Sequence, residues 1–443
     1  MSLAVTPALS ISIHTRWLSV AFHQFIVPHN PKDQVQESSM VLSEAEPRLK
    51  PNTPAPYRML DMWRGIAALW VVMCHACTTM TGSEPEIVRN PFFLFSLSGQ
   101  LGVMMFFVIS GYCIAAAAVS ASQRPRPLLM FFRARLRRIY PPYFASSILM
   151  LVFVGLIGQL VTHHIIPPMH QHAQVEKHSW KFYFAALTLT QVPLHVEPII
   201  MVYWSLCYEI AFYGIVGLAL LLINLRSRTA FFACLNVVTV GSLIWLLSAR
   251  DTCPFPLTLW FQFGMGAMVY QIINYPRERA NKAFLALTLI LAATFAARYV
   301  GPHDLAHPSS RSETLFCAAF TIVVLWMHRL DAAAMRVRAV RGLAWLGTIS
   351  YSLYLTHPIL RPVLQHIGEK LKFTGNKYGL SFLLQITADI GFAFIFFLAV
   401  EKRFLSSGAR KRDALVLLSQ PTGVSDAADD KGLDDLASNL LTK

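Results

Sequence analysis

Residues 92–118 read FFLFSLSGQLGVMMFFVISGYCIAAAA and contain no charged side chain. A run of about 20 apolar residues is long enough to cross the hydrocarbon core of a bilayer as an α-helix. The whole chain has the same character, because 55% of its 443 residues are hydrophobic, only 14% are charged and its mean hydropathy is +0.47. Soluble domains carry roughly 25% charged residues. The composition therefore indicates an integral membrane protein and excludes soluble globular, disordered and disulfide-scaffold proteins.

Similar apolar runs recur along most of the chain, separated by short polar segments. They predict an all-α integral membrane protein with about ten transmembrane helices. A weaker run at 180–192 is too short to cross, and we expect it in a loop or at the membrane interface. The predicted spans are 60–81, 92–118, 139–162, 198–223, 230–249, 255–274, 283–300, 312–330, 343–366 and 379–402.

Basic residues orient these spans. With the N-terminus inside, the loops and tail ends on the inner side hold 23 Lys and Arg, against 9 on the outer side. The positive-inside rule then predicts that both termini are cytoplasmic. The formal net charge of +14 is explained by these loops, so we expect a lipid bilayer as partner and no nucleic acid.

The two ends of the chain differ from its middle. Residues 1–58 are polar and rich in Pro and Ser, which indicates either a disordered cytoplasmic tail or an extension upstream of the true start. The membrane domain is expected at 59–405, and 406–443 is expected to be a disordered cytoplasmic tail. Seven cysteines, scattered mostly through apolar runs, predict no disulfide framework, and no metal site is expected.

Polar residues inside the predicted spans are the first functional candidates, because a charged residue at a helix centre costs roughly 2.5–3.5 kcal/mol. Arg64 and His75 share the run RGIAALWVVMCH. Eleven residues at 100° each end about 20° beyond three full turns, so both side chains share one face, roughly 16 Å apart. The alternative is that Arg64 reaches the headgroups and His75 bonds a neighbouring helix.

Two more predicted spans carry polar stripes. In YWSLCYEIAFYG the polar residues recur every four positions, and in GTISYSLYLTHPILRP they are spaced by 4, 3 and 4. Each spacing puts its members on one helix face. We expect the second stripe to line a water-filled cavity, with an interhelical hydrogen-bond seam as the alternative. Glu209 in the first stripe is a candidate to orient a histidine, relay a proton or hold a ligand hydroxyl. The members are Ser205, Glu209 and Tyr213 in the first stripe, and Ser350, Tyr354, His357 and Arg361 in the second.

Arginines crowd the loop that precedes the third span, in FFRARLRRIYPPY. One explanation is topology charge together with anionic lipid contact. The other is a phosphate-rich ligand, because Arg binds phosphate through two hydrogen bonds at once. The cluster consists of Arg133, Arg135, Arg137 and Arg138.

Five motifs in this order make residues 59–405 resemble the membrane-bound acyltransferase-3 family. Together they are far more specific than any one of them alone. They are R-x10-H (Arg64 and His75), FFVISGY (106–112), R-x-x-R before IYP (Arg135 and Arg138), W-S-L-x-x-E (Trp204, Ser205, Leu206 and Glu209) and ISYSLYLTHP (349–358).

The resemblance implies an enzyme of the bacterial inner membrane that O-acylates a carbohydrate of the cell envelope or one that is exported, such as lipopolysaccharide. It also implies cytoplasmic acyl-CoA, often acetyl-CoA, as the donor substrate, and no permanently bound cofactor. His75 matches the essential histidine of the family, as base or acyl relay, and Arg64, Arg135 and Arg138 match arginines that handle the donor. These residues show no counterpart of the fused extracytoplasmic domain of some relatives, so we expect transfer on this domain alone or with a separate extracytoplasmic transferase partner.

The remaining roles complete the hypothesis. Glu209 joins His75 as a catalytic residue, and the acceptor path or oxyanion site is assigned to Trp204, Ser205, Ser350, Tyr354 and His357. A competing hypothesis is a proton-coupled transporter that uses intramembrane Glu209, Asp389 and the histidines as a relay. The lack of an internal repeat weighs against it.

Overall fold

The computed structural model describes residues 57–81, 90–164, 179–223, 227–299, 310–370 and 378–405. These residues form helices joined by short turns, and none of them lies in a β-strand. The all-α prediction is confirmed. The tails predicted at 1–58 and 406–443 lie outside the described residues, apart from Tyr57 and Arg58.

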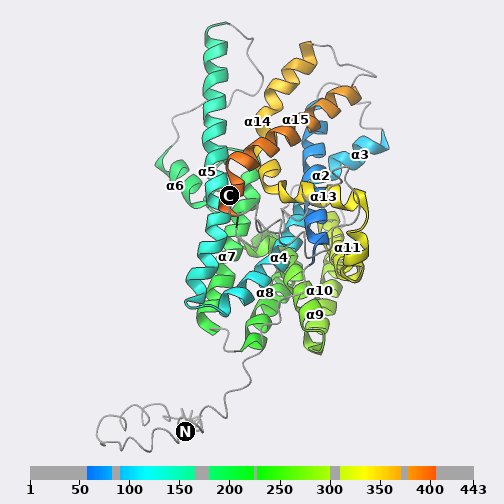
Figure 1. Ribbon diagram of the computed structural model, residues 1–443. Helices are drawn as coiled ribbons and strands as arrows, with labels where there is room; N and C mark the ends of the chain where they lie inside the picture. Colours follow the sequence, from blue (N-terminus) through cyan, green and yellow to red (C-terminus); the bar gives the residue numbers. More distant parts are fainter. Residues whose placement is uncertain are drawn as a thin grey trace, which may run out of the picture. The chain divides into compact units, whose positions relative to one another are not determined.

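Figure 1 shows how the helices are arranged, with colours that follow the sequence. They are α2 (Met59–Thr81), α3 (Pro91–Leu97), α4 (Leu101–Ser122), α5 (Pro127–Thr162), α6 (Trp180–Thr188), α7 (Trp204–Ile223), α8 (Arg228–Ala249), α9 (Trp260–Asn274), α10 (Arg279–Arg298), α11 (Arg311–Met327), α12 (Asp331–Ala334), α13 (Arg338–Thr348), α14 (Ser350–Lys370) and α15 (Tyr378–Ala399). A short 3-10 turn, η9 (Glu401–Phe404), follows α15.

Seven helical segments in the described part of the chain are long and apolar enough to cross a membrane, which fits a multi-pass membrane protein. The predicted count of ten is not reached, in part because α9 has only 15 residues, fewer than a straight span needs. The segments are Pro91–Ser122, Pro127–Thr162, Met201–Ile223, Arg228–Thr252, Arg279–Arg298, Arg311–Ala334 and Gly379–Ala399.

The prediction of one continuous span at 343–366 is wrong. The chain there forms two helices, α13 and α14, which are separated at Ile349. Helix α13 is amphipathic, with charged residues on one face, and it packs along α2 instead of continuing into α14. The short run at 180–192 contains the nine-residue helix α6, which confirms that it is too short to cross.

Close backbone contacts hold α4, which bears the FFVISGY motif, against α9. A Cβ on Gly111 would lie 1.9 Å from the Phe263 carbonyl oxygen, and one on Gly266 would lie 1.8 Å from the Val108 carbonyl oxygen. Only glycine permits this approach at both positions. Beside this contact, the rings of Phe212 and Phe263 stack with their centroids 3.9 Å apart. Helices α4, α7 and α9 thus pack closely together, and α4 and α7 contribute to the site described next.

Candidate active site

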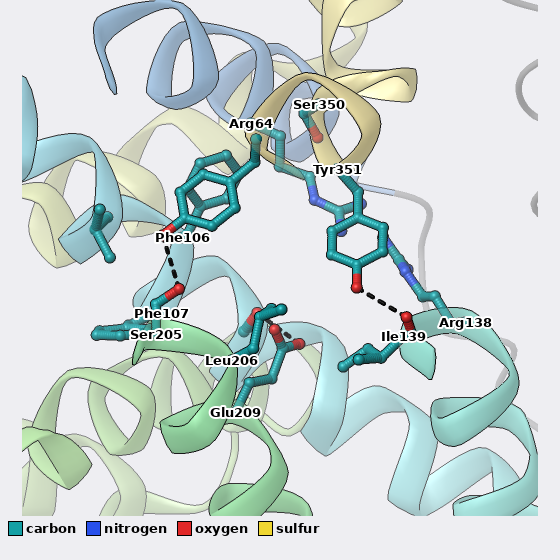
Figure 2. A pocket seen from close by; sticks show the side chains of 13 residues that line it. Arg64, Phe106, Phe107, Arg138, Ile139, Ser205, Leu206, Glu209, Ser350 and Tyr351 are labelled. Atoms are coloured by element: carbon teal, nitrogen blue, oxygen red, sulfur yellow. Dashed lines mark hydrogen bonds between the residues drawn. The ribbon is translucent and has the colours of Figure 1, made fainter. Parts of the chain in front are cut away.

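A cavity lies among α2, α4, α5, α7 and α14, and it encloses about 580 Å³ of empty space, part of it open to solvent (Figure 2). Five helices that are distant in the sequence therefore contribute side chains to one space. Six residues predicted from the sequence line it: Arg64, Arg138, Ser205, Glu209, Ser350 and Tyr354.

Two guanidinium groups enter the cavity from different helices. Figure 2 shows the side chains of Arg64 and Arg138 extending toward each other beside the Tyr351 ring. Arg138 makes no hydrogen bond or ion pair with any residue that the structure describes, whereas Arg64 lies 3.6 Å from Asp61. Like charges repel strongly where water is scarce. This side of the cavity therefore favours an anionic ligand, and guanidinium groups suit phosphate.

Glu209 presents a carboxylate to the same cavity. Its Oε1 accepts a hydrogen bond of 2.6 Å from the Tyr213 hydroxyl and one of 3.4 Å from the Ser110 hydroxyl. The predicted stripe of Ser205, Glu209 and Tyr213 thus lies together on one side of α7. Because two hydroxyls hold it, the carboxylate has a defined position from which it can accept a further hydrogen bond.

A pair of hydroxyls joins α7 to α14 in the cavity wall. The Tyr354 hydroxyl lies 2.7 Å from Ser205 Oγ and donates to the Val202 carbonyl oxygen at 2.9 Å. The Tyr354 ring also meets the Phe106 ring edge-on, with the centroids 5.8 Å apart. This side of the cavity is therefore aromatic and hydroxyl-bearing, in contrast to the side with the two arginines.

His75 of α2 and His357 of α14 form a pair outside the cavity lining. Their ring centroids are 5.0 Å apart. His357 is 2% exposed, its Nδ1 lies 3.1 Å from the Leu353 carbonyl oxygen, and its buried Nε2 has no hydrogen-bond partner among the described residues. Tyr354 lies one turn before His357, with a ring separation of 6.1 Å, and it also lines the cavity. Tyr354 thus adjoins both the cavity and the histidine pair.

Three other candidates are not among the residues that line the cavity. Arg135 is not among the lining residues, and its Nη2 donates to the Cys113 carbonyl oxygen at 3.3 Å. Trp204 packs edge-on against Phe107, with the ring centroids 6.1 Å apart. Asp389, in α15, is 1% exposed, and neither of its carboxylate oxygens has a hydrogen-bond partner in the described part of the chain.

Sequence reasoning missed several lining residues. Phe106, Phe107 and Ser110 all lie in the FFVISGY motif, which predicted no role for its single positions. Tyr351 lies off the predicted stripe of α14, yet it lines the cavity and donates to the Ile139 carbonyl oxygen at 3.0 Å. The FFVISGY motif was the sequence signal for Phe106, Phe107 and Ser110, and no spacing rule points to Tyr351.

The fold and the cavity define a multi-pass integral membrane protein with a cavity built between its helices. The family model described as an acyltransferase domain (acyltransferase-3) matches residues 57–401, and the chain belongs to this family. The protein is therefore a membrane acyltransferase. The family match favours this class over the transporter hypothesis, which the polar residues alone had left open.

Two relatives carry informative names. An O-acetyl transferase of Shigella phage Sf6 is 27% identical over 221 residues, which cover 48% of this chain and 62% of that protein, less than two thirds of its length. The membrane-bound transacylase BcsY of Komagataeibacter xylinus is 25% identical over 339 residues, covering 70% of this chain and 78% of that protein. No solved structure matches the chain.

Proposed function

We propose that this protein transfers an acyl group, most simply acetyl, from acyl-CoA to a hydroxyl of a carbohydrate of the cell envelope or one that is exported, at a bacterial inner membrane. The observation that carries the proposal is the pair of guanidinium groups, from Arg64 and Arg138, in the cavity of a family member. Phosphate groups of CoA are the anions that such a pair suits. The O-acetyl transferase relative supports an oxygen acceptor.

The reaction forms one ester bond and breaks one thioester bond. The acceptor oxygen attacks the thioester carbonyl carbon, the C–S bond breaks, and the hydroxyl proton ends on the sulfur of CoA. A neutral imidazole is the natural group to move this proton near pH 7, and general-base help contributes roughly 10²–10⁴ in rate. We assign this role to His75, either as base or as a transient acyl carrier, with His357 holding it in position.

The cavity residues take supporting roles in this proposal. Arg64 and Arg138 bind the donor phosphates, and Arg135, which lies outside the cavity lining, acts on the donor only through its neighbours. Glu209 accepts a hydrogen bond from the acceptor sugar. The hydroxyls of Ser205, Ser350 and Tyr354 donate to the acceptor or to the developing oxyanion.

The test uses the full chain purified in lipid nanodiscs. Thioester consumption is measured with acetyl-CoA and a panel of envelope glycans, and the ester on the glycan is identified by mass spectrometry. We expect His75→Ala to abolish transfer while CoA binding and the unfolding temperature stay near those of the wild type, and Arg138→Ala to weaken CoA binding. Retained transfer in His75→Ala, or no thioester consumption by the wild type with any glycan, contradicts the proposal.

A further inference from the structure

The aromatic ring of Phe106 lines the cavity, yet it has no role in the reaction proposed above (Figure 2). Phe106 belongs to α4 and is partly buried, and its ring meets the Tyr354 ring edge-on, with the centroids 5.8 Å apart. Among the described residues that line the cavity, Phe106 alone also packs against a second, smaller hydrophobic cluster.

This smaller cluster surrounds the histidine pair. Its buried members Val72 and Ala76 flank His75 in α2. A third member, Leu353 of α14, provides the carbonyl oxygen that lies 3.1 Å from His357 Nδ1. The Phe106 ring therefore lies where the cavity adjoins the surroundings of the two histidines.

Close packing surrounds this position. A Cβ on Gly102 would lie 2.6 Å from the Ala67 carbonyl oxygen of α2, and one on Gly111 would lie even closer to the backbone of α9, so α4 touches two neighbouring helices on either side of Phe106. The Tyr354 hydroxyl has two hydrogen-bond contacts, whereas the Phe106 ring can form none. Because close-packed helices deform little, the space beside Tyr354 depends mainly on the size and rotamer of Phe106.

We propose that the Phe106 ring narrows the route between the cavity and the histidine pair, and thereby limits the length of the acyl group that is transferred. The inference rests on the proposed function, in which the donor phosphates bind in the cavity and the thioester reaches His75, which is not among the lining residues. A ring at this junction admits a short acyl group such as acetyl and excludes a long alkyl chain. Packed apolar sites discriminate between substrates in this way, by size.

The test compares acetyl-CoA, butyryl-CoA and octanoyl-CoA as donors for the full chain in lipid nanodiscs, with the glycan that accepts acetyl. We expect the wild type to consume octanoyl-CoA at least about tenfold more slowly than acetyl-CoA. Phe106→Ala removes the six carbons of the ring, which is the number by which octanoyl exceeds acetyl. This variant should therefore raise the ratio of octanoyl to acetyl turnover about tenfold, while the Kd of CoA stays near that of the wild type.

Phe107→Ala is the matched control, because it removes the same ring from the next position of α4. Phe107 also lines the cavity, but it packs on Phe263, with the ring centroids 4.6 Å apart, and not against the smaller cluster. Its loss should leave the ratio of octanoyl to acetyl turnover unchanged. Equal rates with both donors in the wild type, an unchanged ratio in Phe106→Ala, or an equal rise in Phe107→Ala overturns the inference. Should either alanine variant fail to fold, Phe106→Leu and Phe107→Leu decide by the same ratio.

Histidine modification separates this inference from the proposed function, because it requires no CoA. Diethylpyrocarbonate reacts with neutral imidazole, and peptide mass spectrometry locates the product. We expect Phe106→Ala, and not Phe107→Ala, to speed the labelling of His75 or His357 several-fold, while the exposed His163 is labelled at an unchanged rate. Unchanged labelling of both histidines in Phe106→Ala overturns the inference, whereas a wild type that consumes no thioester contradicts the proposed function.

Discussion

Gly347→Ala is expected to damage the site from a distance by separating two helices that touch through their backbones. A Cβ at Gly347 of α13 would lie 1.7 Å from the Asp61 carbonyl oxygen of α2. Across the same contact, a Cβ at Gly65 would lie 2.1 Å from the Leu343 carbonyl oxygen. Real Cβ atoms essentially never come closer than 3.0 Å to such an atom, so the helices must separate by about 1.3 Å.

This displacement moves the helix that carries Arg64 and His75. Overpacking typically costs about 1–3 kcal/mol, and we expect the upper end here because the obstacle is backbone and no side chain can rotate away. A misplacement of about 1 Å in a catalytic site can lower the rate about 100-fold. Gly347→Ala should therefore lower the unfolding temperature and reduce acetyl-CoA turnover more than the loss of folded protein explains.

Gly342→Ala is the matched control, because it lies on the same helix and its Cβ would meet nothing within 4 Å. Replacing glycine by alanine inside a helix stabilises it by roughly 0.5–1 kcal/mol. Both variants are compared by thermal unfolding, followed through tryptophan fluorescence in detergent, and by thioester consumption per folded molecule. The reasoning is refuted if Gly347→Ala unfolds at the same temperature and turns over at the same rate as Gly342→Ala.

Three smaller effects test other parts of the structure. Tyr354→Phe removes the hydroxyl that lies 2.7 Å from Ser205 Oγ. We expect the free energy of unfolding to fall by about 1 kcal/mol, the typical contribution of one hydrogen bond. Unchanged stability would contradict a hydrogen bond between these two residues. Arg228→Ala breaks the ion pair between Arg228 and Glu278, whose side chains are 30% and 26% exposed, respectively. We expect the free energy of unfolding to fall by less than about 1 kcal/mol, as for exposed ion pairs. A fall of more than about 2 kcal/mol would contradict this expectation. Burial raises the pKa of the Cys253 thiol to about 11. Alkylation of Cys253 by iodoacetamide, measured by peptide mass spectrometry, should therefore be slow at pH 8 and accelerate toward pH 11 as the thiolate forms. Rapid labelling of Cys253 at pH 8 would contradict this expectation.

The membrane-spanning fold could be predicted from the sequence because the bilayer imposes a simple local requirement on each span. Long uncharged runs such as 92–118 therefore correspond to helices in the structure. The break at Ile349 was missed because hydropathy continues through it, while the cause is tertiary. Gly347 brings α13 onto the backbone of α2, and α13 ends at the next residue, Thr348.

Part of the candidate site followed from helix periodicity. Spacing by four placed Glu209 and Tyr213 together, and the structure joins them by a hydrogen bond of 2.6 Å. The approach of Arg64 and Arg138 depends on how α2 and α5 pack, which no local spacing encodes, and only the family motifs pointed to it.

The location of His75 outside the cavity lining agrees with the proposed donor. Acyl-CoA carries its phosphates and its thioester at opposite ends of a flexible arm, so the group that binds the phosphates and the group that acts on the thioester should lie well apart. Arg64 and His75 are separated by three turns of α2, roughly 16 Å. Tyr354 lines the cavity, lies beside His357 of the histidine pair, and contacts Ser205 through its hydroxyl. A single chamber holding Arg64 and His75 side by side would suit a compact donor, whereas this arrangement suits an extended one.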